Sequence, residues 1–266
     1  MLANQLKQIL ENLVIISKKA GDEILDVYKD AFQITLKDDL SPLTDADRRA
    51  NAVITSMLKD LYPEIPILSE EGKEVEFSER KKWDMFWLVD PLDGTKEFVK
   101  RNGEFTVNIA LIKNQLPIAG IVYAPTKSTY WYGAEGLGSY RMTENLDPKR
   151  IRVQESSQAP IRIVSSRSHS SPKLESYLSQ FPEYEIVSMG SSLKICLVAD
   201  SSAHIYPRLG PTMEWDSGAG HAVLKFAGGE LIDRETGEEL IYNKEILKNS
   251  DFICFAPKVK DAYEVL

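Results

Sequence analysis

Residues 87–98 of this chain read Trp87-Leu88-Val89-Asp90-Pro91-Leu92-Asp93-Gly94-Thr95-Lys96-Glu97-Phe98, an apolar run that leads straight into two acids. Proline interrupts a helix, so this pattern predicts a strand that ends at Val89 and a turn that carries Asp90 and Asp93. Two carboxylates placed in this way can converge on one point beyond the strand. Such convergence is typical of a Mg²⁺ site, where a few carboxylate oxygens act together with water and substrate phosphate.

The overall composition indicates a globular protein without the charge pattern for binding nucleic acid, and it leaves a small anionic substrate possible. The 266 residues are 43% hydrophobic, which is enough for a large core, and the formal net charge is −8. This acidic balance does not provide the basic surface that binding to duplex nucleic acid requires. A small anion is compatible with it only where bound cations or local Lys and Arg residues offset the negative field.

The chain carries no pattern that predicts secretion, redox chemistry or a stable partner. Cys196 and Cys254 are far apart in apolar surroundings, so both are expected to be reduced core residues. The N-terminal segment is amphipathic and is neither a signal peptide nor a spanning helix. We therefore expect a cytoplasmic protein, with peripheral association at the inner membrane left open and the oligomeric state unknown.

Hydrophobic periodicity predicts two helices followed by a sheet in the first half of the chain. Apolar residues recur every three or four positions over residues 2–28 and 50–61, and Thr44 or Asp45 is available to cap the second helix. Short apolar runs between Gly, Pro and Asn then predict an antiparallel sheet. Its expected strands are residues 65–68, 85–89, 105–112, 118–123 and 129–132.

The second half of the chain alternates strand and helix patterns. A polar segment, residues 143–160, is the best boundary, so we expect subdomains at 1–155 and 156–266. Strands are expected at 161–165, 184–187, 203–206 and 252–255, and helices after 171, at 191–199 and at 216–226. This alternation predicts an α/β subdomain packed beside an α+β one.

Further acids lie at the ends of the expected elements, where distant parts of a chain meet in one cleft. These acids are Asp47, Glu70 with its neighbour Glu71, and Asp216. Each also has a structural explanation: Asp47 and Asp216 suit a helix start, and Glu70 suits a solvated loop. Asp90 and Asp93 are harder to explain by stability, and they are the strongest functional candidates.

Two polar segments of the second half are candidate anion sites. His169 lies in Ser165-Ser166-Arg167-Ser168-His169-Ser170-Ser171, between an expected strand and helix. Gly190-Ser191-Ser192-Leu193-Lys194 reads as a glycine turn that leads into a helix. Helix capping alone would explain one serine of that turn but not the serines together with Lys194.

The chain resembles the lithium-sensitive, metal-dependent phosphatases of the inositol monophosphatase superfamily. The resemblance rests on Asp90-Pro91-Leu92-Asp93-Gly94-Thr95 and on Trp215-Asp216-Ser217-Gly218-Ala219-Gly220. Further segments resemble the 3′(2′),5′-bisphosphate nucleotidase branch of CysQ type. These segments are Lys96-Glu97-Phe98, Ser41-Pro42-Leu43-Thr44, Gly190–Lys194 and Tyr206-Pro207-Arg208. The resemblance implies a layered αβαβα sandwich.

The resemblance also implies a set of catalytic roles. Two or three Mg²⁺ ions would be held by Glu70 or Glu71, Asp90, the Leu92 carbonyl, Asp93 and Asp216. The amides of Gly94 and Thr95 would bind phosphate, and Asp47 with the Thr95 hydroxyl would activate the attacking water. No phosphoenzyme is expected.

Arg208 distinguishes the expected substrate from others in the superfamily. Inositol monophosphatases resemble this region but have an acid here, which accepts hydrogen bonds from ring hydroxyls, whereas arginine accepts none. The expected reaction is removal of the 3′-phosphate from adenosine 3′,5′-bisphosphate to give AMP, with the sulfated analogue as a second substrate. His169, Ser192 and Lys194 are expected to line the same subsite. The alternatives are an inositol or sugar phosphatase and a non-catalytic nucleotide sensor.

Overall fold

A computed structural model describes residues 3–29, 34–36, 42–154, 160–166, 172–260 and 263 of the chain. The first half is built on a seven-stranded sheet in the order β3-β4-β5-β6-β7-β8-β9. Its strands are β3 (Ile67–Ser69), β4 (Met85–Asp93), β5 (Thr106–Lys113), β6 (Leu116–Ala124), β7 (Thr129–Ala134), β8 (Gly138–Thr143) and β9 (Lys149–Ile151). All neighbouring strands run antiparallel except β3 and β4, which are parallel.

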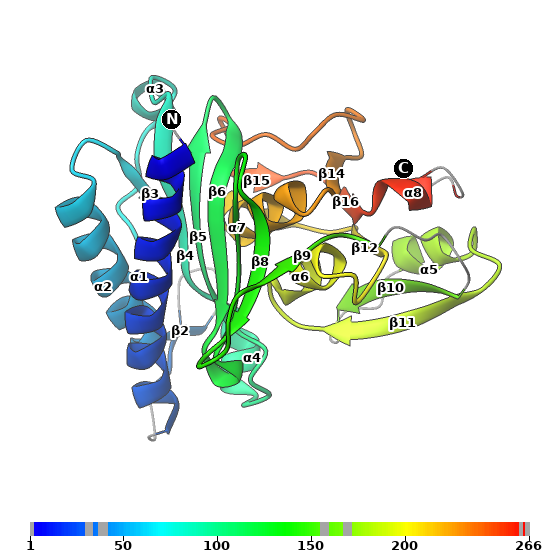
Figure 1. Cartoon of the computed structure of the whole chain (residues 1–266), viewed down its shortest axis with the longest axis horizontal. Helices are drawn as coiled ribbons and strands as arrows, with labels where there is room; N and C mark the ends of the chain where they lie inside the picture. The colour runs from blue at the N-terminus through cyan, green and yellow to red at the C-terminus, as the bar shows by residue number, and fades with distance from the viewer. Residues whose placement is uncertain are drawn as a thin grey trace.

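The alternation of side chains along β4 assigns one face of this sheet to each of two cores. Trp87 and Val89 pack against α1 (Ala3–Lys29) and α2 (Asp45–Leu61), which form the outer helical layer in Figure 1. Phe86 and Leu88 face the opposite core. Because successive side chains of a strand point to opposite faces, Asp90 shares the second face with Leu88.

The opposite core lies between the first sheet and a second one, and it contains α6 (Leu193–Ala199) and α7 (Glu214–Phe226). The second sheet has the order β11-β10-β12-β16-β14. Its strands are β10 (Ile161–Ser166), β11 (Tyr184–Met189), β12 (Ile205–Arg208), β14 (Glu230–Asp233) and β16 (Phe252–Phe255). The chain passes from β10 through α5 (Pro172–Leu178) to the parallel strand β11, and then returns through α6 to β12 on the other side of β10. Because such crossovers are right-handed, two that run in opposite directions along the sheet place their helices on opposite faces.

The result is the layered αβαβα sandwich that the resemblance implied, visible across Figure 1 from α1 to α5. The remaining elements are short. They are β1 (Ile34–Leu36), β2 (Pro42–Thr44), α3 (Phe77–Arg80), α4 (Thr95–Val99), the 3₁₀ turn Pro125–Lys127, β13 (Thr212–Met213), β15 (Lys248–Asn249) and α8 (Pro257–Lys260). The strands of the first sheet precede residue 155, and those of the second sheet follow it. The division into two subdomains at residues 155 and 156 stays a prediction.

Several sequence-based expectations need correction. The first sheet is not wholly antiparallel, because β3 reaches β4 by a crossover through α3. The segment expected to be a boundary contains β9, whose residues are largely exposed and therefore lack an apolar pattern. His204 precedes β12 rather than lying on it. Cys196 and Cys254 are free and buried, as expected.

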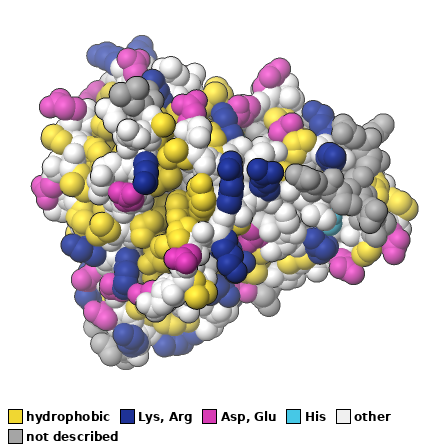
Figure 2. Space-filling model, viewed as in Figure 1, with side chains coloured by type: hydrophobic (Ala, Val, Ile, Leu, Met, Phe, Trp, Pro, Cys, Tyr) yellow, Lys and Arg dark blue, Asp and Glu magenta, His cyan; other side chains and the backbone are white. Residues whose placement is uncertain are grey.

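The surface facing the viewer in Figure 2 carries an apolar groove between α1 and the β7–β8 hairpin. Its apolar lining comes from Leu10, Val14, Tyr132, Leu137, Tyr140, Met142 and Pro148. Within the described part of the chain, no helix combines the length and the apolar character needed to cross a bilayer.

Candidate active site

A bulge in β4 brings Asp90 and Asp93 to the same face of the sheet. Asp90 pairs with Asn108 and Asp93 with Thr106, so β4 uses one residue more than β5 between these two pairs. Without that extra residue, positions three apart would point to opposite faces. The strand thus continues to Asp93, and the prediction of a turn after Val89 was wrong. The predicted convergence of the two acids is nevertheless confirmed.

Asp216 completes the cluster from the first turn of α7. One carboxylate oxygen each from Asp90, Asp93 and Asp216 lies within 4.8 Å of the others. Asp216 Oδ2 accepts the Met213 backbone N–H at 2.9 Å, which caps the helix and fixes the carboxylate. Three acids from two elements distant in sequence therefore meet at one point.

The electrostatics of this cluster favour a bound cation. Burial, together with repulsion from Glu70 and Asp93, raises the pKa of Asp90 well above its usual range. Burial and the neighbouring Asp93 raise the pKa of Asp216 to about 7. Clustered carboxylates disfavour one another's charge unless a cation compensates it. Convergent carboxylate oxygens are the ligands that hard divalent ions prefer, so these residues fit Mg²⁺.

Two other predicted acids lie close to the cluster. Glu70 directly follows β3, and its backbone N–H donates to the Val89 carbonyl at 3.1 Å. Its negative charge helps to raise the pKa of both Asp90 and Asp216. Glu71 is not among the groups that act most strongly on these pKa values, which favours Glu70 as the inward residue. Asp47 is buried on the first turn of α2 and also raises the pKa of Asp90.

Asp93 is held by the turn that precedes α6. Its Oδ2 accepts hydrogen bonds from Ser191 Oγ at 2.7 Å, Ser192 N–H at 2.6 Å and Ser192 Oγ at 2.7 Å. Ser192 Oγ also lies 2.7 Å from the Asp216 carbonyl oxygen. The predicted substrate residue Ser192 therefore contacts the Asp93 carboxylate and the Asp216 backbone, in addition to lining the cleft.

The cleft beside the cluster is rich in cationic side chains. Lys194 is buried, its Nζ donates to the Ser191 carbonyl at 2.6 Å, and it lies 5.7 Å from the centre of the Tyr206 ring. Arg208 donates to the Pro211 carbonyl at 2.8 Å, while its buried Nε has no hydrogen-bond partner among the described residues. The charged residues of the lining are Asp93, Lys96, Glu97, Lys194, Arg208 and Asp216.

The remaining predicted residues are placed as follows. The Leu92 backbone N–H donates to Asp90 Oδ1 at 3.1 Å, within the bulge. Gly94 has φ +91° and precedes α4, whose first residue is Thr95; Gly94 lines the cleft. His169 lies outside the described residues.

Sequence reasoning missed the residues that support the cluster from β5. Asn108 Nδ2 donates to Ser192 Oγ at 2.9 Å, and Thr106 Oγ1 lies 2.6 Å from Ser191 Oγ. Glu104 accepts the Gly190 N–H at 2.8 Å. The available signal was the alternation of polar Thr106 and Asn108 with apolar residues in an otherwise apolar strand.

Comparison with known proteins gives one consistent result. The model of the inositol monophosphatase family matches residues 5–263. The 3′(2′),5′-bisphosphate nucleotidase CysQ of Salmonella typhimurium strain LT2 is 44% identical over 247 residues, which cover 92% of this chain and 98% of that protein. The protein of the same name from Escherichia coli strain K12 is 44% identical over 250 residues, with the same coverage.

Solved structures agree in fold. The crystal structure of CysQ from Bacteroides thetaiotaomicron superposes with a TM-score of 0.81 at 42% identity, covering 91% of this chain and 94% of that one. The inositol monophosphatase of Anabaena (Nostoc) sp. PCC 7120, at 21% identity and a TM-score of 0.75, covers 97% and 94% and shares the fold. The chain therefore belongs to the inositol monophosphatase family.

Proposed function

We propose that this protein is a Mg²⁺-dependent phosphatase that removes the 3′-phosphate from adenosine 3′,5′-bisphosphate, giving AMP and phosphate, with the sulfated analogue as a second substrate. The observation that carries the proposal is the carboxylate cluster of Asp90, Asp93 and Asp216 beside a cleft that contains Lys194 and Arg208. Support also comes from relatives named 3′(2′),5′-bisphosphate nucleotidase, which are 44–45% identical over 98% of their length.

The metal site in this proposal consists of residues from both halves of the chain. Asp90, Asp93, Asp216, Glu70 and the Leu92 carbonyl oxygen would hold two or three Mg²⁺ ions. When bound, Mg²⁺ would neutralise the clustered carboxylates and stabilise charge on the phosphoryl oxygens. Ser191 and Ser192 fix one carboxylate oxygen of Asp93, which leaves the other oxygen of that side chain for a cation.

The chain's own residues would orient the phosphate and activate the water. The backbone amides of Gly94 and Thr95 start α4 and would donate hydrogen bonds to phosphate oxygens. Asp47 is buried near Asp90 and would accept the proton of the attacking water, while the Thr95 hydroxyl would hydrogen-bond that water and help to polarise it.

The cationic side chains of the cleft support a substrate with a second anionic group. Arg208 presents an unpartnered buried N–H, Nε, which a phosphate oxygen can satisfy. Arginine offers donors only, so it suits phosphate better than the hydroxyls of an inositol ring. Lys194 supplies a second positive charge in the same cleft.

The test is release of phosphate from adenosine 3′,5′-bisphosphate and from inositol 1-phosphate, measured side by side with Mg²⁺, without it, and with added Li⁺. We expect Mg²⁺-dependent, Li⁺-sensitive turnover with a strong preference for the nucleotide. Preference for inositol phosphate would reject the role of Arg208 in specificity.

The variant Asp47→Asn separates an enzyme from a non-catalytic nucleotide sensor. Asparagine is close to isosteric but cannot take up a proton, so turnover should fall by about 10²–10⁴-fold while metal-dependent nucleotide binding persists. Full activity in this variant would contradict the proposed water activation. Binding of the nucleotide by the wild-type protein without any turnover would favour the sensor.

A further inference from the structure

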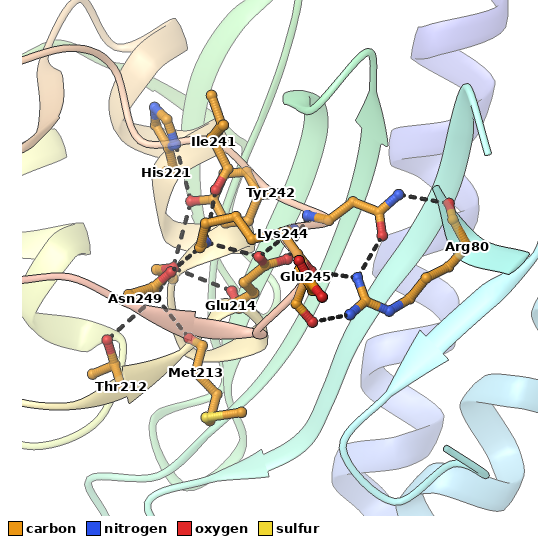
Figure 3. A network of polar contacts seen from close by, with 12 residues as sticks. Arg80, Thr212, Met213, Glu214, His221, Ile241, Tyr242, Lys244, Glu245 and Asn249 are labelled. Carbon is orange, nitrogen blue, oxygen red and sulfur yellow. Dashed lines mark hydrogen bonds and ion pairs between the residues drawn. The ribbon is translucent and has the colours of Figure 1, made fainter. Parts of the chain in front are cut away.

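Glu214 begins α7 two residues before Asp216, and its side chain is fully buried. Figure 3 shows it surrounded by donors from the loop after Tyr242. Glu214 Oε1 accepts the Lys244 N–H at 2.9 Å and Lys244 Nζ at 2.7 Å, and Oε2 accepts the Asn243 N–H at 2.6 Å. Both oxygens of this carboxylate are therefore engaged by one segment of the chain.

Further along the same segment, Leu247, just before β15, and Asn249 of β15 hold the start of α7 on either side of Asp216. Asn249 Nδ2 lies 2.9 Å from the Met213 carbonyl and 3.0 Å from Ser217 Oγ. The Glu214 N–H donates to the Leu247 carbonyl at 2.9 Å. Lys244 Nζ donates in turn to Asn249 Oδ1 at 3.1 Å, which joins these contacts into one network (Figure 3). The first turn of α7 is therefore held by several hydrogen bonds from one segment, residues 243–249.

Arg80 connects this segment to the first half of the chain. It is only 3% exposed and lies at the end of α3, in the connection that leads into β4. Its Nη1 donates to Asn243 Oδ1 at 2.9 Å and its Nη2 to the Glu245 carbonyl at 2.6 Å, while Asn243 Nδ2 donates to the Arg80 carbonyl at 2.7 Å. The segment that holds α7 is thus fixed to the connection that leads into the strand carrying Asp90 and Asp93.

Stability alone does not account for this arrangement. A fully buried carboxylate loses its hydration, and a well-packed apolar side chain at the same place is often equally stable or more so. A carboxylate that accepts three hydrogen bonds does, however, fix the position and orientation of the helix that carries it, because each bond restricts where the first turn of α7 can lie. A metal site needs its ligands held to within about 0.5 Å.

We propose that Glu214 is a positioning residue that fixes the first turn of α7, and with it Asp216, relative to Asp90 and Asp93. The inference rests on the proposed function, in which Asp216 is a ligand of Mg²⁺. Glu214 would not contact metal or substrate, since it does not line the cleft. It would act through the backbone that it shares with Asp216.

The test is metal affinity measured without substrate in the variant Glu214→Gln. Glutamine must turn its NH₂ group toward either the Asn243 N–H or the Lys244 N–H, so one hydrogen bond becomes a clash of two donors. Binding of Mn²⁺, followed by electron paramagnetic resonance and displaced by Mg²⁺, should weaken by about 10–100-fold. In phosphatase assays, excess Mg²⁺ should restore most of kcat, because the catalytic groups themselves are unchanged.

Two further variants separate positioning from a loss of folding. Asp200→Asn is the matched control, since the Asp200 side chain is 3% exposed and accepts Trp131 Nε1 at 2.9 Å. It should unfold at lower temperature but bind Mn²⁺ like the wild type. Asn243→Gly keeps the φ of +65° at that position and the N–H to Glu214 but loses the bonds with Arg80. Its Mn²⁺ affinity should lie between those of the wild type and Glu214→Gln.

Each outcome decides the inference. Wild-type Mn²⁺ affinity in a folded Glu214→Gln protein overturns it, as does equal weakening in Asp200→Asn. If Glu214→Gln does not fold, unchanged affinity in Asn243→Gly overturns it. A wild-type protein that binds no Mn²⁺ overturns the proposed function together with the inference, whereas wild-type binding without an effect of the variants overturns the inference alone.

Discussion

Lys194 is the one buried lysine of the cleft within the described residues, and its environment makes its charge depend on pH near neutrality. Burial lowers the pKa of its amine from 10.5 to about 8, although the nearby acids Asp93 and Glu97 oppose this shift. An amine with a lowered pKa is charged below about pH 8 and neutral above it. A residue that binds phosphate by charge would therefore lose that ability as the pH rises through this value.

We expect kcat/KM for adenosine 3′,5′-bisphosphate to fall above about pH 8 as Lys194 loses its charge, with a slope that approaches tenfold per pH unit. This parameter is the suitable one because its pH dependence reports the ionisation of groups in the free enzyme. The measurement is a profile from pH 6.5 to 9.5 at saturating Mg²⁺. Lys194→Met should lower kcat/KM and remove this alkaline limb. Arg208→Met should lower it but keep the limb, since a guanidinium does not titrate in this range. A limb that survives in Lys194→Met would assign the titration to another group.

At the residue scale, the sequence located the acids well and their supports poorly. Asp90 and Asp93 were predictable because an apolar strand that leads into two acids is hard to explain by stability, and Asp216 was predictable from the family resemblance; the structure brings all three together. Ser191 and Asn108 were not predicted as supports of the cluster, because a hydroxyl or amide in a turn or strand has many local uses. Their role appears only once β4, β5 and the α6 turn are placed side by side.

The bulge in β4 shows that the conformation of an element, like the support of a side chain, can depend on residues outside the local sequence. The sequence correctly predicted that Asp90 and Asp93 converge, but it attributed their convergence to a turn, whereas the structure has a bulge within a continuous strand. Pro91 was a signal for a bulge, because proline within a sheet is confined to edges, strand starts and bulges. The bulge itself is set by pairing with the next strand, β5, and a local reading of residues 87–98 does not include that partner. The partly exposed strands β8 and β9 escaped prediction because they lack apolar alternation.

The contact between α7 and the first sheet depends on small residues. A Cβ at Gly120 of β6 would lie 2.7 Å from Ala222 Cβ and 3.0 Å from the Ala219 carbonyl oxygen, so the helix would have to move. Gly218 of α7 makes room for a side chain of the same sheet, since its Cβ would lie 2.8 Å from Leu88 Cδ2. The position of α7, and of Asp216 on it, is therefore set by close approach of backbone to backbone.

We expect Gly120→Ala to lower the free energy of unfolding by about 1–3 kcal/mol, because the backbone of α7 must shift to admit the methyl group. Urea unfolding measures this, and Mn²⁺ titration should show weaker metal binding in the folded variant. Gly210→Ala is the control, because its Cβ would meet nothing within 4 Å, and its stability should be unchanged or slightly raised. Equal stability of the two variants would contradict the packing argument.

At the scale of the whole molecule, the cluster of acids joins the two halves of the chain. Asp90 and Asp93 belong to the first sheet and Asp216 to the helix that packs between the sheets. Repulsion among these carboxylates opposes the folded state when no cation is bound, whereas a bound cation favours it. The layered architecture followed from the family resemblance, while the packing of α7 on the first sheet is a long-range contact that no local pattern predicts.

Mg²⁺ should therefore stabilise the folded protein. At a concentration of 100 times Kd, we expect the free energy of unfolding to rise by about 2.7 kcal/mol, measured by urea unfolding with and without the ion. Asp216→Asn should abolish most of this gain. It should also be more stable than the wild type without Mg²⁺, because one of the repelling buried charges is gone. Lower stability of the metal-free variant would contradict the repulsion.

The late position of α7 in the sequence has a consequence for synthesis on the ribosome. The seven strands of the first sheet end at Ile151, but the helix that covers their second face spans Glu214–Phe226. A nascent chain that has just completed this sheet has α1 and α2 for one face and nothing yet for the other, which exposes Phe86, Leu88 and their neighbours. Until α7 emerges, this face is the surface that a chaperone would recognise and that would drive misassembly between unfinished chains.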